Sequence, residues 1–426
     1  MKNQNYVNSS DFLEEKIKAR PLNRRRIIRR VVEVALLAVV FGLIACFTMI
    51  IVAPILEERL FKTPANEIIL TEESAPHTSE EMSPEDMLLE EWYEPNSSEE
   101  ETDSEEQLLN LAYILRKSAQ DCQKWLVQVA GVSSETSWLE STKTSSNIAS
   151  GAIIADSGTE FLILVEKENL QEADRIEVTF TNDCVVQGRI KGTDAYSGFM
   201  VVAVSKEGIG EEILSEYQAA ELASSNNKSL LGSVVLALGN TNGVAGSVNY
   251  GFVTSIGVEA NSWDCNYKLI KTDIYGSNNP SGFLVNLKGQ IIGVLCNDYN
   301  STDTKNLLSA VGISDLKKKI ECMSNEVKIP VLGIKGTDVT QQAHKENGIP
   351  TGAYVTNVKL SSPAMHAGIQ AGDVIVKIGE KEISSMIALT YHLYQSKVGE
   401  PVTVVIMRPS QGTYKESTLK ITLGSQ

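Results

Sequence analysis

Histidine is scarce in this chain of 426 residues, which contains only His77, His344, His366 and His392. None of the four lies between residues 108 and 325. Histidine is the side chain whose ordinary pKa falls near neutral pH, and it is the most frequent general base in enzymes. A serine nucleophile needs an imidazole to take its proton and pass it to the leaving group. The sequence therefore excludes Ser-His-Asp chemistry within residues 108–325.

Lysine and arginine are absent from residues 67–106, where sixteen acidic residues occur. This segment accounts for the whole net charge of −16, and the rest of the chain is close to neutral. Nucleic-acid binding is not expected, because phosphate neutralisation requires clustered lysine and arginine on the folded part. A segment so rich in like charges cannot bury enough apolar surface to offset its ordering entropy. We expect residues 57–106 to be an acidic disordered linker, either a solvated stalk or a docking tail for a basic partner.

Cysteine pairs with metal-ligand spacing are also missing. The six cysteines are widely spaced, with no Cys-x-x-Cys pair: Cys46, Cys122, Cys184, Cys265, Cys296 and Cys322. This spacing does not favour zinc ligation, and the sequence implies neither a metal nor a cofactor. The first cysteine lies in an apolar run. The other five leave at least one thiol unpaired or paired between chains, and spacing alone assigns no disulfide.

Charged residues are missing from residues 34–56. A helix needs about 20 apolar residues to cross a bilayer core. A cluster of arginines precedes the run, and the positive-inside rule keeps such a cluster in the cytoplasm: Arg20, Arg24, Arg25, Arg26, Arg29 and Arg30. The alternative is a cleaved signal peptide, whose apolar region is usually about 7–15 residues long. We expect a single-pass protein of the cell membrane, with a cytoplasmic basic tail (1–30), a transmembrane helix (31–56) and extracytoplasmic domains.

Short apolar runs separated by turn residues dominate residues 107–325. Apolar residues first follow a helical spacing at 108–122. Strands are then predicted at 125–132, 148–154, 161–165, 176–180, 185–190, 199–204, 233–238, 247–256 and 291–295. A closing helix is predicted at 307–323. Many short strands with turns between them favour a closed or sandwiched all-β domain.

Seven short segments of this β-rich region form an ordered set. They read ASGAII at 149–154, ADRIEVTF at 173–180, GTD at 192–194, LGSVVLALGN at 231–240, GFVTSI at 251–256, TD at 272–273 and LVNLKG at 284–289. In this order they resemble the HtrA/DegP family of membrane or periplasmic serine proteases, although no single segment is specific. The resemblance implies that residues 107–325 form a trypsin-like domain, the chymotrypsin-like double β-barrel.

The departures from the family pattern fall on the catalytic positions. The family's histidine follows a strand that here reads FLILV at 161–165. Depending on a gap, Glu166, Lys167 or Glu168 stands at that position. The catalytic aspartate is replaced by Gly198. A serine nucleophile in this domain would therefore lack both of its usual partners.

The nucleophile loop of the family has changed as well, and it reads SNNPSGFL at 277–284. One alignment places Pro280 at the serine position, where its missing N–H would also remove an oxyanion donor. The other places Ser281 there, without an activating imidazole or carboxylate. A Ser-Lys dyad would need Lys167 or Lys271 as a desolvated base. We assign no catalytic residue and expect a degenerate triad at Glu166, Glu168, Gly198, Pro280 and Ser281.

A second set of motifs occupies the C-terminal block, residues 326–426. It includes GAYV at 352–355, SPAMHAGI at 362–369 and QAGDVI at 370–375. These motifs resemble a PDZ domain of the kind found in the HtrA family. PDZ domains capture extended C-termini by strand addition, and backbone N–H groups hold the terminal carboxylate. A domain that merely packs on the barrels is the alternative.

The resemblance also identifies a candidate peptide site in this block. The sequence VLGI at 331–334 resembles the carboxylate-binding loop and the strand that pairs with the peptide. A helix predicted at 384–397 would line the groove, with Ile387, Leu389 and Leu393 facing the peptide. The peptide-binding prediction comprises Val331, Leu332, Gly333, Ile334, Leu389 and Leu393.

These observations predict a membrane-anchored, HtrA-like pseudoprotease that binds rather than cleaves. Its PDZ domain would recognise free apolar C-termini or unfolded segments of extracytoplasmic proteins, as an adaptor, chaperone or sensor in the cell envelope. The resemblance implies a homotrimer or a mixed oligomer. One alternative is an active HtrA-type serine endopeptidase in envelope protein quality control. The other is a non-catalytic subunit that assembles with an active paralogue.

Overall fold

The computed structural model describes residues 68–70, 104–132, 148–170, 173–180, 184–207 and 209–425. All of them belong to one compact unit, Asn66–Gln426. The predicted cytoplasmic tail, the predicted transmembrane helix and most of the predicted acidic linker lie outside the described residues. Within the described ranges, no helix is long and apolar enough to span a bilayer.

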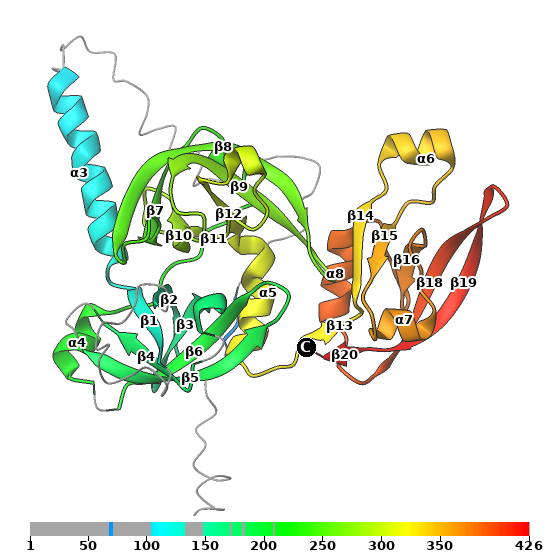
Figure 1. The fold of residues 1–426 in the computed structure, drawn as a ribbon, viewed down its shortest axis with the longest axis horizontal. Coiled ribbons are helices and arrows are strands. Elements are labelled where there is room, and N and C mark those ends of the chain that lie inside the picture. The colour runs from blue at the N-terminus through cyan, green and yellow to red at the C-terminus, as the bar shows by residue number, and fades with distance from the viewer. Residues whose placement is uncertain are drawn as a thin grey trace, which may run out of the picture. The chain divides into compact units, whose positions relative to one another are not determined.

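Six antiparallel strands close into a first barrel in the order β1-β2-β3-β6-β5-β4 (Figure 1). The strands are β1 (Leu126–Val132), β2 (Ile148–Asp156), β3 (Glu160–Glu166), β4 (Arg175–Thr179), β5 (Val185–Asp194) and β6 (Phe199–Ser205). The helices around them are α3 (Ser104–Cys122), η2 (Glu168–Leu170) and α4 (Glu211–Glu216). Strands β3 and β6 are buried along almost their whole length, so both of their faces are apolar and their sequences read as continuous apolar runs.

Six further strands close into a second barrel in the order β10-β11-β12-β9-β8-β7 (Figure 1). They are β7 (Val234–Asn240), β8 (Ser247–Asn261), β9 (Asn266–Tyr275), β10 (Ser281–Val285), β11 (Ile291–Leu295) and β12 (Leu307–Gly312). The accompanying helices are η3 (Lys228–Leu230), η4 (Thr302–Thr304) and α5 (Ile313–Ser324). The two closed barrels confirm the predicted double-barrel domain.

The predicted helix at 307–323 is wrong in its first third. Residues Leu307–Gly312 form strand β12, which pairs with β11 and β9 and thereby closes the second barrel. This strand is buried on both faces, and a short apolar run of that kind cannot be told from a buried helix by periodicity. The helix α5 begins only at Ile313.

The C-terminal domain is a sheet with three helices (Figure 1). Its strand order is β14-β15-β16-β18-β19, with β17 paired to β16 and a separate β13-β20 pair. The elements are β13 (Pro330–Val331), β14 (Ile334–Asp338), α6 (Gln341–Asn347), β15 (Ala353–Val358), α7 (Pro363–Ala367), β16 (Val374–Ile378), β17 (Lys381–Glu382), α8 (Met386–Tyr394), β18 (Pro401–Ser410), β19 (Thr413–Thr422) and β20 (Gly424–Ser425). Helix α8 matches the predicted groove helix, and it begins where the Ser385 hydroxyl caps the N–H of Ala388.

A buried ion pair links α5 to both barrels. The ammonium of Lys319 lies 2.6 Å from Asp194 Oδ2 at the end of β5, and it donates to the hydroxyl of Tyr267 in β9 at 2.7 Å. The two charged side chains are 1% and 0% exposed. Burial acts against the charge of Asp194, but the Lys319 ammonium outweighs it and lowers the pKa of that carboxyl. The pair is therefore charged and depends on both partners.

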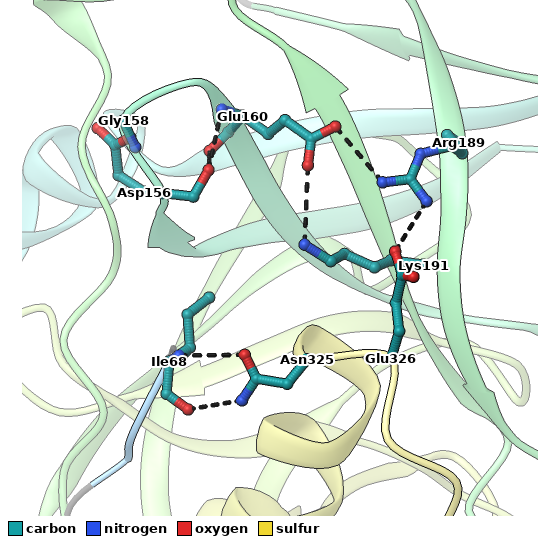
Figure 2. A network of polar contacts seen from close by, with 9 residues as sticks. Ile68, Asp156, Gly158, Glu160, Arg189, Lys191, Asn325 and Glu326 are labelled. Carbon is teal, nitrogen blue, oxygen red and sulfur yellow. Dashed lines mark hydrogen bonds and ion pairs between the residues drawn. The ribbon is translucent and has the colours of Figure 1, made fainter. Parts of the chain in front are cut away.

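Residues 68–70 are the described part of the predicted linker, and Ile68 is hydrogen-bonded to Asn325 at the end of helix α5. The N–H of Ile68 donates to Asn325 Oδ1 at 3.1 Å, and Asn325 Nδ2 donates to the Ile68 carbonyl at 2.9 Å (Figure 2). Next to Asn325, the carboxylate of Glu326 pairs with Arg189 of β5 at 3.0 Å. One amide side chain thus satisfies both polar groups of Ile68. This short segment is therefore bound to the folded part of the chain through Ile68.

The five cysteines in the described part of the chain form no disulfide: Cys122, Cys184, Cys265, Cys296 and Cys322. Burial raises the pKa of the Cys122 and Cys296 thiols to about 12. A buried thiol of this kind is a small apolar side chain rather than a nucleophile.

Candidate functional site

The positions at which the family pattern requires histidine and aspartate lie side by side. Glu166 ends strand β3 and pairs with Phe199 of β6. The N–H of Lys167 donates to the carbonyl of Gly198 at 2.7 Å. The fold therefore brings the candidate histidine positions, residues 166 and 167, next to Gly198, the predicted aspartate position.

The environment of Glu166 disfavours its charge. The side chain is mostly buried, and burial together with the nearby carboxylates of Glu168 and Asp298 raises its pKa to about 8. At neutral pH the group is therefore mainly the protonated acid. An uncharged carboxyl group cannot accept a proton from a serine hydroxyl, so the raised pKa of Glu166 disfavours a role as general base at neutral pH.

The residue Ser281 is enclosed in the structure. It begins strand β10 directly after the buried Pro280, and it is 1% exposed. Its hydroxyl oxygen accepts the N–H of Ser150, on strand β2 of the first barrel, at 3.1 Å. The loop before it is held in turn, because the N–H of Ser277 donates to the Thr241 carbonyl at 2.7 Å. This hydroxyl cross-links the two barrels and is not presented to solvent.

Neither of the two lysines predicted as a possible base is desolvated. The side chains of Lys167 and Lys271 are partly exposed, whereas a lysine base needs desolvation to lose its proton near neutral pH. The buried lysine Lys319 is held by Asp194, and its pKa is raised well above the ordinary value. Every histidine that the structure describes belongs to the C-terminal domain: His344, His366 and His392.

The predicted carboxylate-binding loop lies between strands β13 and β14. Val331 ends the short strand β13, and Ile334 begins β14. Between them Gly333 has a φ of +87°, and a side chain there would come within 2.3 Å of the Ser362 Cβ. The left-handed backbone turns consecutive N–H groups toward one point, which is how backbone loops bind anions.

One carboxylate occupies this loop, and it comes from the second barrel. The Oδ1 atom of Asp264 accepts the N–H groups of Gly333 and Ile334 at 2.7 and 2.9 Å. Its Oδ2 atom accepts those of Leu332 and Gly333, both at 2.9 Å. Burial raises the pKa of Asp264, and the N–H donors of the loop act against that change. The loop therefore binds a carboxyl group that belongs to the chain itself.

The predicted peptide-facing residues of helix α8 differ in their exposure to solvent. Leu389 and Leu393 are 0% exposed and belong to the core of the C-terminal domain, whereas Ile387 is 46% exposed. The side chain of α8 that contacts the Asp264 segment is Thr390, whose hydroxyl donates to the Asp264 carbonyl at 2.7 Å. Neither Asp264 nor Thr390 was predicted, and no local pattern marks them, because both act through contacts distant in sequence.

Comparisons with known proteins agree with this architecture. A family model for the PDZ domain matches residues 330–423. The chain is 26% identical over 296 residues to the serine protease Do-like HtrB of Bacillus subtilis, covering 65% of this chain and 62% of that protein. It is 26% identical over 327 residues to a serine protease HtrA-like protein of Staphylococcus aureus, covering 72% of this chain and 41% of that protein. The chain thus spans less than two thirds of the length of either relative.

Solved structures show the same fold. The HtrA-type protease AlgW, in complex with a decapeptide, aligns with a TM-score of 0.52 at 19% identity, over 73% of this chain and 98% of that one. The serine endoprotease from Yersinia pestis aligns with a TM-score of 0.50 at 21% identity, over 73% and 98% of the two chains. Both alignments support two barrels followed by a PDZ domain.

Proposed function

We propose that this chain, a member of the HtrA family with a PDZ domain, acts by binding protein segments and not by cleaving them. The observation that carries the proposal is the loop at 331–334, whose consecutive N–H groups converge on one carboxylate. A carboxylate-binding loop beside a strand suits an extended C-terminus. Such a peptide adds to the sheet as a further strand and places its terminal carboxylate in the loop.

The absence of cleavage is supported by the chemistry of the barrels. No histidine lies between residues 108 and 325. The carboxyl group of Glu166 is mainly protonated at neutral pH, and the hydroxyl of Ser281 is buried against β2. Activity in this fold needs a nucleophile, its base and its orienting acid together. We infer that the double barrel is a scaffold, although its relatives are named serine proteases.

The proposed setting is the outer face of a cell membrane. The charge-free run at 34–56 and the arginines before it support a single transmembrane helix with a cytoplasmic N-terminus. The barrels and the PDZ domain would then meet extracytoplasmic proteins with free apolar C-termini or unfolded segments. In this position the protein would serve as an adaptor, chaperone or sensor.

A second candidate is a non-catalytic subunit in an oligomer with an active paralogue. Helix α3 supports it, because Leu108, Leu109 and Tyr113 are each more than 60% exposed. Exposed apolar side chains gathered on one helix mark interaction surfaces. Co-purification of an active protease with this chain from membranes would favour that candidate over a binding protein that works alone.

We expect the purified full chain to bind peptides that end in an apolar residue with a free carboxylate. The affinity should be roughly micromolar, about −8 kcal/mol, because one short strand forms the interface. Amidation of the peptide's C-terminus should weaken binding at least tenfold, since it removes the charge that the N–H groups bind. Fluorescence anisotropy with the two labelled peptides measures the difference.

The substitution Gly333→Val should abolish this binding, because the side chain would collide with Ser362. The control is Gly379→Val, which imposes similar backbone strain at a φ of +59° in a turn with nothing nearby. That variant should bind like the parent chain. Equal binding of free-acid and amidated peptides would contradict carboxylate capture and leave the PDZ domain as a packing partner of the barrels.

A further inference from the structure

The carboxylate in the PDZ loop is carried by a β-hairpin of the protease-like domain. Asp264 lies in the turn that joins β8 to β9, where it adopts a φ of +60° and is 2% exposed. Its four contacts with the N–H groups of residues 332–334 are those that a terminal carboxylate of a peptide would make. The loop is therefore not available to another anion while the hairpin is in place.

The main chain of the hairpin also follows the path of a peptide ligand. The N–H of Asp264 donates to the Ile334 carbonyl at 2.7 Å, and Asn266 Nδ2 donates to the Gly336 carbonyl at 3.3 Å. Both carbonyls belong to β14, the strand that follows the carboxylate loop. From the other side, the Thr390 hydroxyl of α8 donates to the Asp264 carbonyl. The hairpin tip thus lies between β14 and α8, where the extended peptide would bind.

Cation–π contacts hold the hairpin from outside the groove. The ammonium of Lys335 lies 5.0 Å from the ring centroid of Trp263, and that of Lys359 lies 5.9 Å from it. Lys359 also lies 4.3 Å from the ring centroid of Tyr196 in the first barrel, and it donates to that hydroxyl at 3.2 Å. Such contacts are individually weak, so they favour a closed arrangement without making it permanent.

We propose that the β8–β9 hairpin is an internal ligand of the PDZ groove, and that a protein C-terminus binds only by displacing Asp264. This inference rests on the proposed function, because it assigns a competitor to the same carboxylate loop. The partner is a chain with a free terminal carboxylate, whose charge substitutes for that of the aspartate. Its arrival would release the barrel from the PDZ domain.

The hydrogen-bond balance makes this exchange reversible. The incoming carboxylate satisfies the N–H groups of the loop that Asp264 leaves, while the released aspartate and its main-chain groups become hydrated. The hairpin is part of the same chain, so it competes at a high effective concentration. The apparent association constant for a peptide equals the intrinsic constant multiplied by the fraction of chains in which the groove is open. The full chain should therefore bind peptides more weakly than its loop alone allows.

The test is the substitution Asp264→Asn in the full chain. The amide has nearly the shape of the carboxylate but only one acceptor atom and no charge, so the hairpin should leave the groove while the loop itself is unchanged. A labelled peptide with a free apolar C-terminus should bind at least tenfold more tightly to this variant than to the parent chain in fluorescence anisotropy. The matched control is Asp303→Asn, which removes the same charge from an exposed site in the same barrel and should leave the affinity unchanged.

The possible outcomes separate this inference from the proposed function. Equal affinity of the parent chain and Asp264→Asn for the free-acid peptide would overturn the internal-ligand proposal and leave peptide capture standing. Failure of the free-acid peptide to bind either protein, or indifference to amidation, would overturn peptide capture itself and the competition with it. If Asp264→Asn does not fold, Trp263→Ala takes its place, with a smaller gain of about threefold expected because the contacts of Trp263 with Lys335, Lys359 and Tyr196 are lost while the carboxylate stays in the loop.

Hydrogen exchange gives a readout that does not depend on affinity. In the parent chain the N–H of Asp264 is bonded to Ile334, so it should exchange slowly. Saturating free-acid peptide should accelerate exchange at residues 262–266, and the amidated peptide should not. Unchanged protection of these residues in the peptide-bound chain would mean that the peptide binds elsewhere and would overturn the proposal.

Discussion

Replacing Lys319 by methionine is expected to lower the free energy of unfolding by about 3–5 kcal/mol. The substitution leaves Asp194 buried at 0% exposure without the ammonium that lies 2.6 Å from it. An uncompensated charge in the interior costs far more than the pair contributes when intact. The loss should appear in urea unfolding at neutral pH as a lower midpoint.

Two further variants identify the cause. Lys124→Met breaks a surface pair with Asp121 in which both side chains are about half exposed, and it should cost less than about 1 kcal/mol. Combining Lys319→Met with Asp194→Leu should recover part of the loss, because neither member of this pair then leaves an unpaired buried charge. A loss for Lys319→Met no larger than that for Lys124→Met would contradict a charged pair in the interior.

Replacing Glu166 by glutamine is expected to stabilise the protein at alkaline pH. The pKa of Glu166 is raised from 4.5 to about 8 in the folded chain. A carboxyl group with a raised folded pKa contributes stability below its unfolded pKa, and that contribution is lost as the pH rises through the folded pKa. Each pKa unit corresponds to about 1.4 kcal/mol, so the loss between pH 4.5 and 8 amounts to roughly 2–4 kcal/mol after allowance for partial exposure.

The stability of the parent chain should therefore fall relative to Glu166→Gln across this window, and the difference should level off above pH 8. Urea unfolding at pH 5, 6.5, 8 and 9 gives the comparison. Glu207→Gln, an exposed substitution of the same kind, serves as the control and should track the parent chain. A difference between Glu166→Gln and the parent chain that is the same at every pH would show that Glu166 does not titrate in this range.

The double barrel and the PDZ domain could be predicted because their signals are local and repeated. Buried strands such as β3 and β6 are continuous apolar runs, and turn motifs such as QAGDVI at 370–375 mark the PDZ domain. Strand β12 was assigned to a helix because a buried apolar run has no period of its own. No strand is predicted at β9, where the alternation of buried and partly exposed residues is interrupted at Leu269 and Ile270, which are both buried.

Only part of the candidate site could be predicted from the sequence. The carboxylate loop has a local signature, since a glycine between apolar residues permits the left-handed turn at Gly333. Its occupant has none, because Asp264 is 69 residues away from that glycine along the chain and meets it only through tertiary folding. The same holds for Ser281, since it is buried at a contact with Ser150 of the other barrel, which is 131 residues away along the chain.

Binding without turnover is the central claim for this chain, and one incubation tests it. The purified full chain is mixed with a peptide that carries a free apolar C-terminus, and peptide binding and peptide mass are followed over many hours at pH 7 and pH 9. The higher pH ionises Glu166, whose pKa is about 8, and so offers a replacement base its best opportunity. We predict a saturable complex from which the peptide is recovered intact at both pH values. Cleavage products that form at either pH, and that disappear in Ser281→Ala, would contradict the account and identify the chain as an active protease.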